Sequence, residues 1–284
     1  MNTYEMLMLL RDNLGEAAEA HWTDLNLLRR LNAAHGKIAA KVANAPGDWL
    51  LKKSSSITPS SSQLTLPSDC MVPAYLEEVS SGFAIPIRGT VRERREGRLP
   101  GTSLYTGTVE AYLIGNYIEV NQDSFASPCY IWYQPRLVDL QAGVCGSSSD
   151  ATHVHFEAAH WPSGTDDYYN GVVVEVRDAT SHILNVSTAI TDYVGATFLA
   201  TVASVAATPA SGDFYGTVSQ LPAEFHEWVV AKATVSAMSK PSSTFEKEVF
   251  GFWKSELRDL EEEMTTLLSS RLSGSTYTRI AETD

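Results

Sequence analysis

The sequence predicts an α+β fold: a helical body made by N- and C-terminal helices, with a long C-terminal helix, a small β region and an inserted all-β sandwich or barrel module. Three observations predict it. Apolar residues recur every three or four positions at both ends of the chain, which is the helical period. Short apolar runs separated by turn residues fill the middle. A glycine- and serine-rich stretch at 143–151 indicates a boundary. The expected units are 1–148, 149–219 and 220–284, the last packing with the N-terminal helices.

Two amphipathic helices are expected at the start of the chain. The first covers residues 3–19. The second covers 24–42, with Thr23 or Asp24 as its cap, and its apolar stripe runs through Leu27, Leu28, Leu31, Ala34, His35, Ile38 and Val42. Because His35 lies on this stripe, we expect it to be a hydrogen-bonded histidine at a packed interface and not a metal ligand.

The small β region is expected to follow the break at Pro46-Gly47. Residues 48–70 predict two short extended segments around a serine-rich turn, and 67–69 predict a short helical turn. Gly115-Asn116 between two alternating apolar runs predicts a hairpin over 109–121. Further strands are expected at 83–89 and 129–140.

Five strand-like runs make up the expected β module. They are residues 153–158, 172–178, 182–190, 197–204 and 213–218. The second and third runs are expected to pair across the tight turn 178–181. Inserted domains have close termini, so residues 150–219 are expected to be removable without unfolding the helices.

Two helices are expected to close the chain. The first opens at Leu221-Pro222 and ends at Pro241. The second, capped by Ser242 or Ser243, runs to Leu272 as a rod of ~42 Å. Its stripe consists of Phe245, Val249, Phe252, Trp253, Leu257, Leu260, Met264, Leu267, Leu268 and Leu272. A stripe of that length needs a partner along all of it. That partner is either other subunits or the core of a monomer.

The composition limits the classes of function. With 34 acidic and 21 basic residues, the net charge is −13, so the chain is a poor candidate for wrapping nucleic acid, although it could line a passage for DNA. The three cysteines are far apart, which suits a reducing compartment and gives no zinc spacing. The N-terminus lacks signal-peptide features, and no apolar run approaches the ~20 residues of a membrane span.

One segment of this acidic chain is basic. Residues 88–98 hold five arginines: Arg88, Arg92, Arg94, Arg95 and Arg98. These arginines predict one of two things. One is a positively charged binding surface for an acidic partner or for phosphate, and the other is a solvated hairpin tip whose charge Glu93 and Glu96 partly neutralise. No aromatic residues interleave the arginines, which disfavours a nucleic-acid platform.

Candidate catalytic and metal-binding residues are few. His153 and His155 share a strand face, with His160, Asp166 and Asp167 nearby in sequence, but the spacing matches no established metal motif. Residues 166–171 are typical of a turn and not of a calcium loop. No hydrolase elbow, P-loop or dinucleotide motif is present. We therefore expect no enzyme, cofactor or metal.

Several stretches together resemble a known family. They are the aromatic strand and Pro-x-Leu turn 131-IWYQPRLVDL-140, the closing Leu-Pro-x-Glu-Phe-His helix at 221–226 with a long helix after it, and 168-YYNGVVVEV-176 with 189-AITDYVGATFLATV-202. The layout is similar to tailed-phage head-to-tail adaptor proteins, also called connector or head completion proteins, over roughly residues 20–140 and 220–272. The inserted pair resembles a β module of phage virion proteins. The insert and the acidic rod depart from the shortest family members.

The resemblance implies a homo-oligomeric ring, typically twelve-fold, in the virion at the head–tail junction, made in the host cytoplasm. Such rings sit under the portal protein, extend the DNA channel without sequence-specific binding, and offer a surface to the tail or nozzle protein. It also implies that Phe252, Trp253 and Leu257 bury against the portal or adjacent subunits. Tyr277 and Ile280 would then act as a latch. Separately, because the arginines have no aromatic partners in a net-acidic chain, the arginine segment is expected to contact an acidic neighbour through charge pairs.

Two other functions remain open from the sequence. The β module could be a carbohydrate or receptor binder of a capsid decoration or tail protein, with aromatic residues stacking on sugars: Trp161, Tyr168, Tyr169, Tyr193 and Tyr215. A hydrolase would need two carboxylates about 5–10 Å apart in a cleft.

Overall fold

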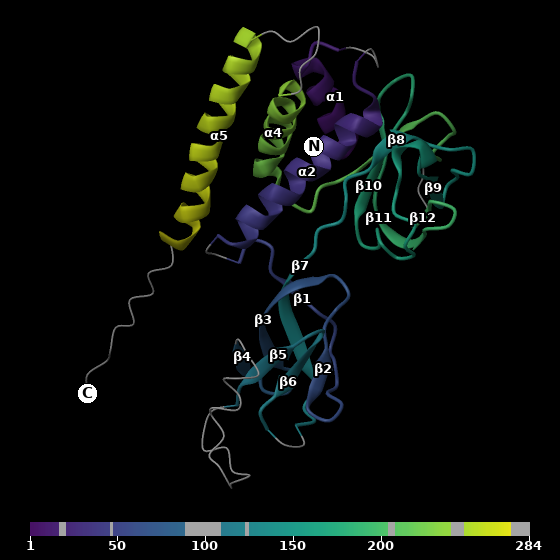
Figure 1. Ribbon diagram of the computed structural model, residues 1–284. Helices are drawn as coiled ribbons and strands as arrows, with labels where there is room; N and C mark the ends of the chain where they lie inside the picture. The colour runs from purple at the N-terminus through teal and green to yellow at the C-terminus, as the bar shows by residue number, and fades with distance from the viewer. Residues whose placement is uncertain are drawn as a thin grey trace, which may run out of the picture. The chain divides into compact units, whose positions relative to one another are not determined.

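The computed structural model describes residues 1–16, 21–45, 48–88, 109–122, 125–203, 208–239 and 247–273 (Figure 1). The chain forms two compact units, one from residues 1–47 and 138–284, the other from Asp48–Leu137. Each contains a curled sheet, of six strands in the first and seven in the second. The expected helical body with a small β region is therefore wrong, because two half-barrel sheets carry most of the architecture.

The first unit holds an antiparallel sheet with the strand order β8-β13-β10-β11-β12-β9. Its strands are β8 (Ala142–Val144), β9 (His153–His155), β10 (Val173–Arg177), β11 (Leu184–Val194), β12 (Leu199–Val202) and β13 (Phe214–Thr217). The five expected runs are confirmed, and β10 pairs with β11 as predicted, with Val174 opposite Thr188. The additional strand β8 lies before residue 149 and pairs with β13, so this sheet extends beyond the predicted module.

The inner face of this sheet is closed by valines and aromatic rings. Val174 and Val176 alternate inward along β10, as the two-residue period of a strand requires. The rings of Phe156 and Tyr215 stack with their centroids 4.7 Å apart. Tyr169 and Tyr193 meet edge to face at 4.8 Å in the same core.

The helices of this unit are α1 (Thr3–Asn13), α2 (Asp24–Ala43), α4 (His226–Met238) and α5 (Lys247–Ser273), with short 3-10 turns η1 (Ala158–His160) and η2 (Ala223–Phe225). The α2 prediction is confirmed, including the Thr23 cap, whose side chain accepts the Asn26 N–H at 3.3 Å. Helix α1 is shorter than the expected 3–19, because Leu14 caps it and Gly15 follows with a φ of 70°. Helix α4 packs against α1 and α2, as expected for the C-terminal part.

Helix α1 is anchored to β13 and β10 of the six-stranded sheet. Asn2 forms a β-bridge with Val218, and its side chain donates to Glu175 at 2.8 Å. The Thr3 hydroxyl donates to the Thr217 carbonyl at 2.6 Å. These bonds make the N-terminal helix part of the β module's own structure.

Gly216 lets β13 approach this helix closely. A Cβ at Gly216 would lie 2.6 Å from the backbone nitrogen of Tyr4, so the Gly216→Ala protein is expected to lose about 1–3 kcal/mol of unfolding free energy through overpacking. Gly36→Ala is the matched control. Gly36 is an exposed residue of α2 with open space around it, so this change should stabilise by up to ~1 kcal/mol. Urea unfolding of both variants checks this. Equal stability of the two would contradict the close approach.

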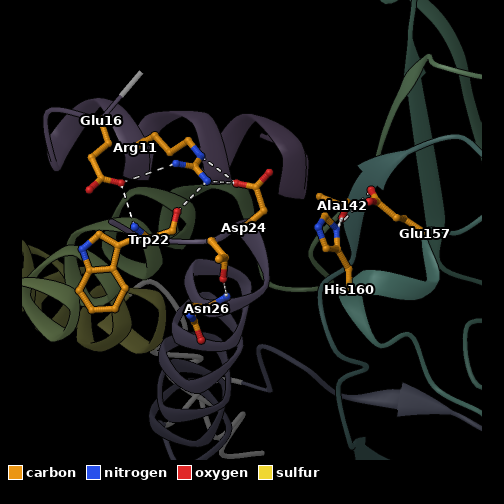
Figure 2. Close-up of polar contacts among 9 residues, drawn as sticks. Arg11, Glu16, Trp22, Asp24, Asn26, Ala142, Glu157 and His160 are labelled. Atoms are coloured by element: carbon orange, nitrogen blue, oxygen red, sulfur yellow. Dashed lines mark hydrogen bonds and ion pairs between the residues drawn. The ribbon is translucent and has the colours of Figure 1, made fainter. Parts of the chain in front are cut away.

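A buried arginine ties α1 to the start of α2 (Figure 2). Arg11 is 3% exposed; its Nε donates to Asp24 at 2.7 Å and its Nη2 donates to the Trp22 carbonyl at 3.1 Å. Glu16 lies 3.8 Å from the same guanidinium and also accepts the Trp22 N–H. Because the charge is paired and hydrogen-bonded, its burial is tolerated.

The second unit contains the other sheet, ordered β1-β7-β3-β4-β5-β6-β2. Its strands are β1 (Lys52–Lys53), β2 (Gln63–Thr65), β3 (Cys70–Glu78), β4 (Ala84–Arg88), β5 (Ala111–Ile114), β6 (Tyr117–Val120) and β7 (Cys129–Pro135). All neighbours are antiparallel except β4 and β5. The Gly115-Asn116 hairpin is confirmed, with Ile114 opposite Tyr117. Ile57 in the serine-rich loop bridges Cys129, and a turn at 67–69 precedes β3.

The chain thus divides differently from the predicted units 1–148, 149–219 and 220–284. The sheet expected as an insert shares a unit with the N- and C-terminal helices, and the small β region is a unit of its own. The predicted glycine- and serine-rich boundary at 143–151 falls inside the first unit and overlaps β8.

Candidate interface on the C-terminal helices

Helix α5 packs against α4 through its C-terminal half (Figure 1). Met264 and Leu268 are 4% and 6% exposed, and Lys232 of α4 forms an ion pair with Glu261 at 3.2 Å. Of the side chains from Glu248 to Leu260, none is buried. The predicted apolar stripe is therefore covered over only part of its length.

The uncovered part of the stripe holds the expected contact residues. Phe252 is 60% exposed and Val249 is exposed as well, whereas Trp253 and Leu257 are half-buried. The rings of Phe252 and Trp253 meet edge to face, with centroids 5.6 Å apart. A contiguous apolar surface of this kind is typical of a contact site.

A groove of about 740 Å³ runs between the start of α4 and the C-terminal half of α5. Its apolar lining is Phe225, Trp228, Leu260, Met264 and Leu267, and its polar lining is Glu224, Asp259, Glu262, Glu263 and Thr266. Trp228 is 3% exposed, and its Nε1 has no hydrogen-bond partner among the described residues. A buried donor left without an acceptor is costly to the fold.

The groove is negatively charged along its rim. Asp259 pairs with the exposed Arg258 at 3.3 Å. The carboxylates of Glu224, Glu262 and Glu263 have no lysine or arginine partner within the part of the chain that the structure describes. The lysines nearest the groove's tryptophan, Lys41 and Lys232, lie over the Trp228 ring at 4.9 and 5.4 Å from its centroid.

The structure describes one of the five arginines. Arg88 ends β4 and pairs with Glu110 at 3.2 Å, with 59% of its side chain exposed. The other candidate interface residues lie outside the described residues: Arg92, Arg94, Arg95, Arg98, Tyr277 and Ile280.

The histidines considered for a metal site make separate interactions. His153 bonds Asp150 at 3.0 Å, while His160 donates from Nδ1 to the Ala142 carbonyl at 2.6 Å, with Glu157 at 3.7 Å (Figure 2). Asp166 accepts the Gly195 N–H at 2.8 Å. Asp167 accepts from the Asn170 amide within the turn at 2.7 Å. The described ranges contain no group of three or more potential metal ligands.

The aromatic residues considered for sugar stacking do not form one exposed face. Tyr169, Tyr193 and Tyr215 are core residues, at most 1% exposed. Tyr168 packs against the same core, and only Trp161 is largely exposed, with Arg29 over its ring at 4.2 Å. The stacking surface expected for a carbohydrate binder is therefore wrong for three of its five residues. The strand period turns Tyr193 and Tyr215 inward, and Tyr169 is buried from the turn that precedes β10.

His35 has the hydrogen-bonded, packed position that its place on the stripe predicts. Its Nε2 lies 3.0 Å from Ser219 Oγ, and the residue is 3% exposed. Burial, together with the nearby His226, lowers the pKa of His35 to about 4. Burial also lowers the pKa of His226, whose Nε2 contacts the Leu221 carbonyl at 3.1 Å.

Sequence reasoning found the exposed stripe and missed the groove. The only local signal was the run of carboxylates at 259–263 beside stripe residues. Across the described ranges, no helix is long and apolar enough to cross a membrane. Protein-family models gave no match to the chain, and neither did the curated proteins.

Proposed function

We propose that this chain is a structural virion protein, a head-to-tail adaptor that forms a ring under the portal, extends the DNA channel and provides the attachment surface for the tail or nozzle. The single observation that carries the proposal is the uncovered apolar stripe of α5, centred on Phe252. A 27-residue helix that leaves such a face open in the single chain is suited to a contact between subunits or with a partner protein.

The charge of the chain supports the same assignment. A net charge of −13 disfavours tight wrapping of DNA and suits a passage through which DNA slides. The sequence resemblance supplies the identity of the partners, which are the portal protein and a tail or nozzle protein. The carbohydrate-binding alternative has less support, because three of the tyrosines it needs are in the core.

Phe252→Ser is expected to weaken binding of the chain to portal rings while leaving its fold intact. Phe252 is exposed in the single chain, so its loss costs the contact and not the core. Burial of such a ring contributes roughly 1.5–3 kcal/mol, about a tenfold or larger change in affinity per copy, and a ring repeats that gain. Negative-stain imaging and light scattering, with and without portal rings, measure the effect.

Phe83→Ser is the matched control, because Phe83 is 54% exposed and lies in the other unit. It should leave portal binding unchanged. A wild-type chain that stays a monodisperse monomer and ignores portal rings would overturn the proposed function. Equal portal binding by the Phe252 and Phe83 variants would move the contact away from α5.

A further inference from the structure

The groove between α4 and α5 combines two features that select one kind of occupant. Its lining is apolar at Phe225, Leu260 and Met264, and its rim carries carboxylates. An occupant therefore needs cations and apolar side-chain carbon. An arginine-rich polypeptide offers both, since arginine has an aliphatic stem and a guanidinium that pairs with carboxylates.

The chain itself carries such a polypeptide. Residues 88–101 hold five arginines against two glutamates, whereas the chain as a whole has 13 more acidic than basic residues. We infer that the arginine segment 88–98 of a neighbouring copy occupies the α4–α5 groove, in an inter-subunit contact that rests on the proposed ring.

This pairing joins two different surfaces of the same protein. The arginine segment belongs to the second unit and the groove to the first. A contact between unlike patches is heterologous, and repeated copies of it close into a ring when the rotation between subunits permits. The groove and the arginine segment together supply the inter-subunit contact that a ring of this chain requires, and the one basic segment of a net-acidic chain gains a binding partner.

The direct test is binding of a fluorescent peptide with the sequence of residues 88–101. The receptor is the full chain with Arg92→Glu, Arg94→Glu and Arg95→Glu, which removes its own competing segment. Adding Glu262→Lys and Glu263→Lys to that receptor should weaken peptide binding about tenfold or more, because two favourable charge pairs become repulsive. The matched control is Glu248→Lys with Glu256→Lys, which makes the same charge change on α5 outside the groove and should leave binding unchanged.

The second test separates a neighbour's segment from the chain's own. A chain with the three Arg→Glu changes keeps a normal groove, and a chain with Glu262→Lys and Glu263→Lys keeps a normal segment. Each alone should self-associate less than wild type by light scattering, and an equal mixture should recover association, because each segment then meets a groove of opposite charge.

The outcomes separate this inference from the proposed function. The neighbour contact is overturned if both charge-reversed variants associate as well as wild type. It is also overturned if they lose association and mixing does not restore it, which would point to a segment bound within its own chain. If the wild-type chain never forms a ring, the proposed function is wrong. The peptide-binding experiment then tests the groove contact by itself. If Glu262→Lys and Glu263→Lys leave peptide binding unchanged, the groove is not the binding site of the arginine segment.

Discussion

Deletion of residues 150–219 is expected to unfold the helices together with the six-stranded sheet. This reverses what the sequence predicts for an inserted module. Helix α1 begins with a β-bridge to Val218 and a hydrogen bond from Thr3 to Thr217, and the Tyr4 ring stacks on Phe214 at 4.7 Å. Without these partners, an 11-residue helix is too short to persist in water. A domain is stable by only ~5–15 kcal/mol, so removing most of the sheet's core as well is expected to unfold the unit.

The measurement is the far-UV circular dichroism of the deletion variant. All four α-helices that the structure describes belong to the unit that loses these residues, so the helical signal reports that unit. Replacement of residues 48–137 by a flexible linker is the control. It removes the seven-stranded sheet, no strand of which pairs with the other sheet in the described residues, and should keep the helical signal. If the deletion variant kept its helical signal, residues 150–219 would be an independent module, as the sequence predicts.

Long, periodic elements were predictable from the sequence. Every predicted stripe position of α2, from Leu27 to Val42, is buried. An amphipathic pattern sustained over 20 residues fixes which face of the helix packs against the core. The two-residue turn between β5 and β6 and the pairing of β10 with β11 were predictable from local turn chemistry.

Short strands and distant pairings were not predictable. Strands β1, β2 and β8 have two or three residues, too few to show an alternation. Ile57 joins the sheet through a single bridge inside a serine-rich stretch that reads as loop. The fold class was wrong for this reason: the residues that extend each sheet carry no local pattern, and their pairing depends on contacts far apart in the chain.

The candidate interface was predictable only in part. The stripe through Phe252 and Leu257 follows from spacing, but spacing cannot tell which half of a helix is covered. That depends on where α4 lies, and the buried side chains of α5 at this contact are Met264 and Leu268. The groove needs Trp228 beside residues about 30 positions later, which no local pattern specifies.

The unfolding free energy of the first unit, which holds the four α-helices, is expected to fall steeply below pH 6.5, with His35 as a principal cause. His35 is buried on α2, and its folded-state pKa is about 4 against an ordinary value near 6.5. Because the folded pKa is the lower one, the unfolded chain binds the proton more readily throughout this interval. Stability is therefore full above pH 6.5 and is lost as pH falls toward 4.

The size of the effect follows from the two pKa values. Their difference corresponds to about 3 kcal/mol for His35, a large fraction of a domain's stability. His226 acts in the same direction, since burial and the Met1 amino group lower its pKa, opposed by the Leu221 carbonyl and Glu224. Hydrogen bonds lower the pKa values of Asp150 and Asp178 as well, so the wild-type curve alone does not isolate the histidine.

His35→Gln isolates the contribution of His35. Glutamine can keep a hydrogen bond to Ser219, but it does not fill the space of the buried ring, so the variant should be less stable than wild type at pH 7. Because glutamine takes up no proton, its unfolding free energy should fall by about 2–3 kcal/mol less than that of wild type between pH 7 and pH 4. Urea unfolding followed by the helical signal at several pH values measures this difference. His21→Gln is the control, because His21 is exposed and should leave the wild-type pH dependence unchanged. If the His35 and His21 variants lose stability in parallel with wild type, then His35 is not held neutral in the fold, and the pH dependence comes from His226 and the carboxylates instead.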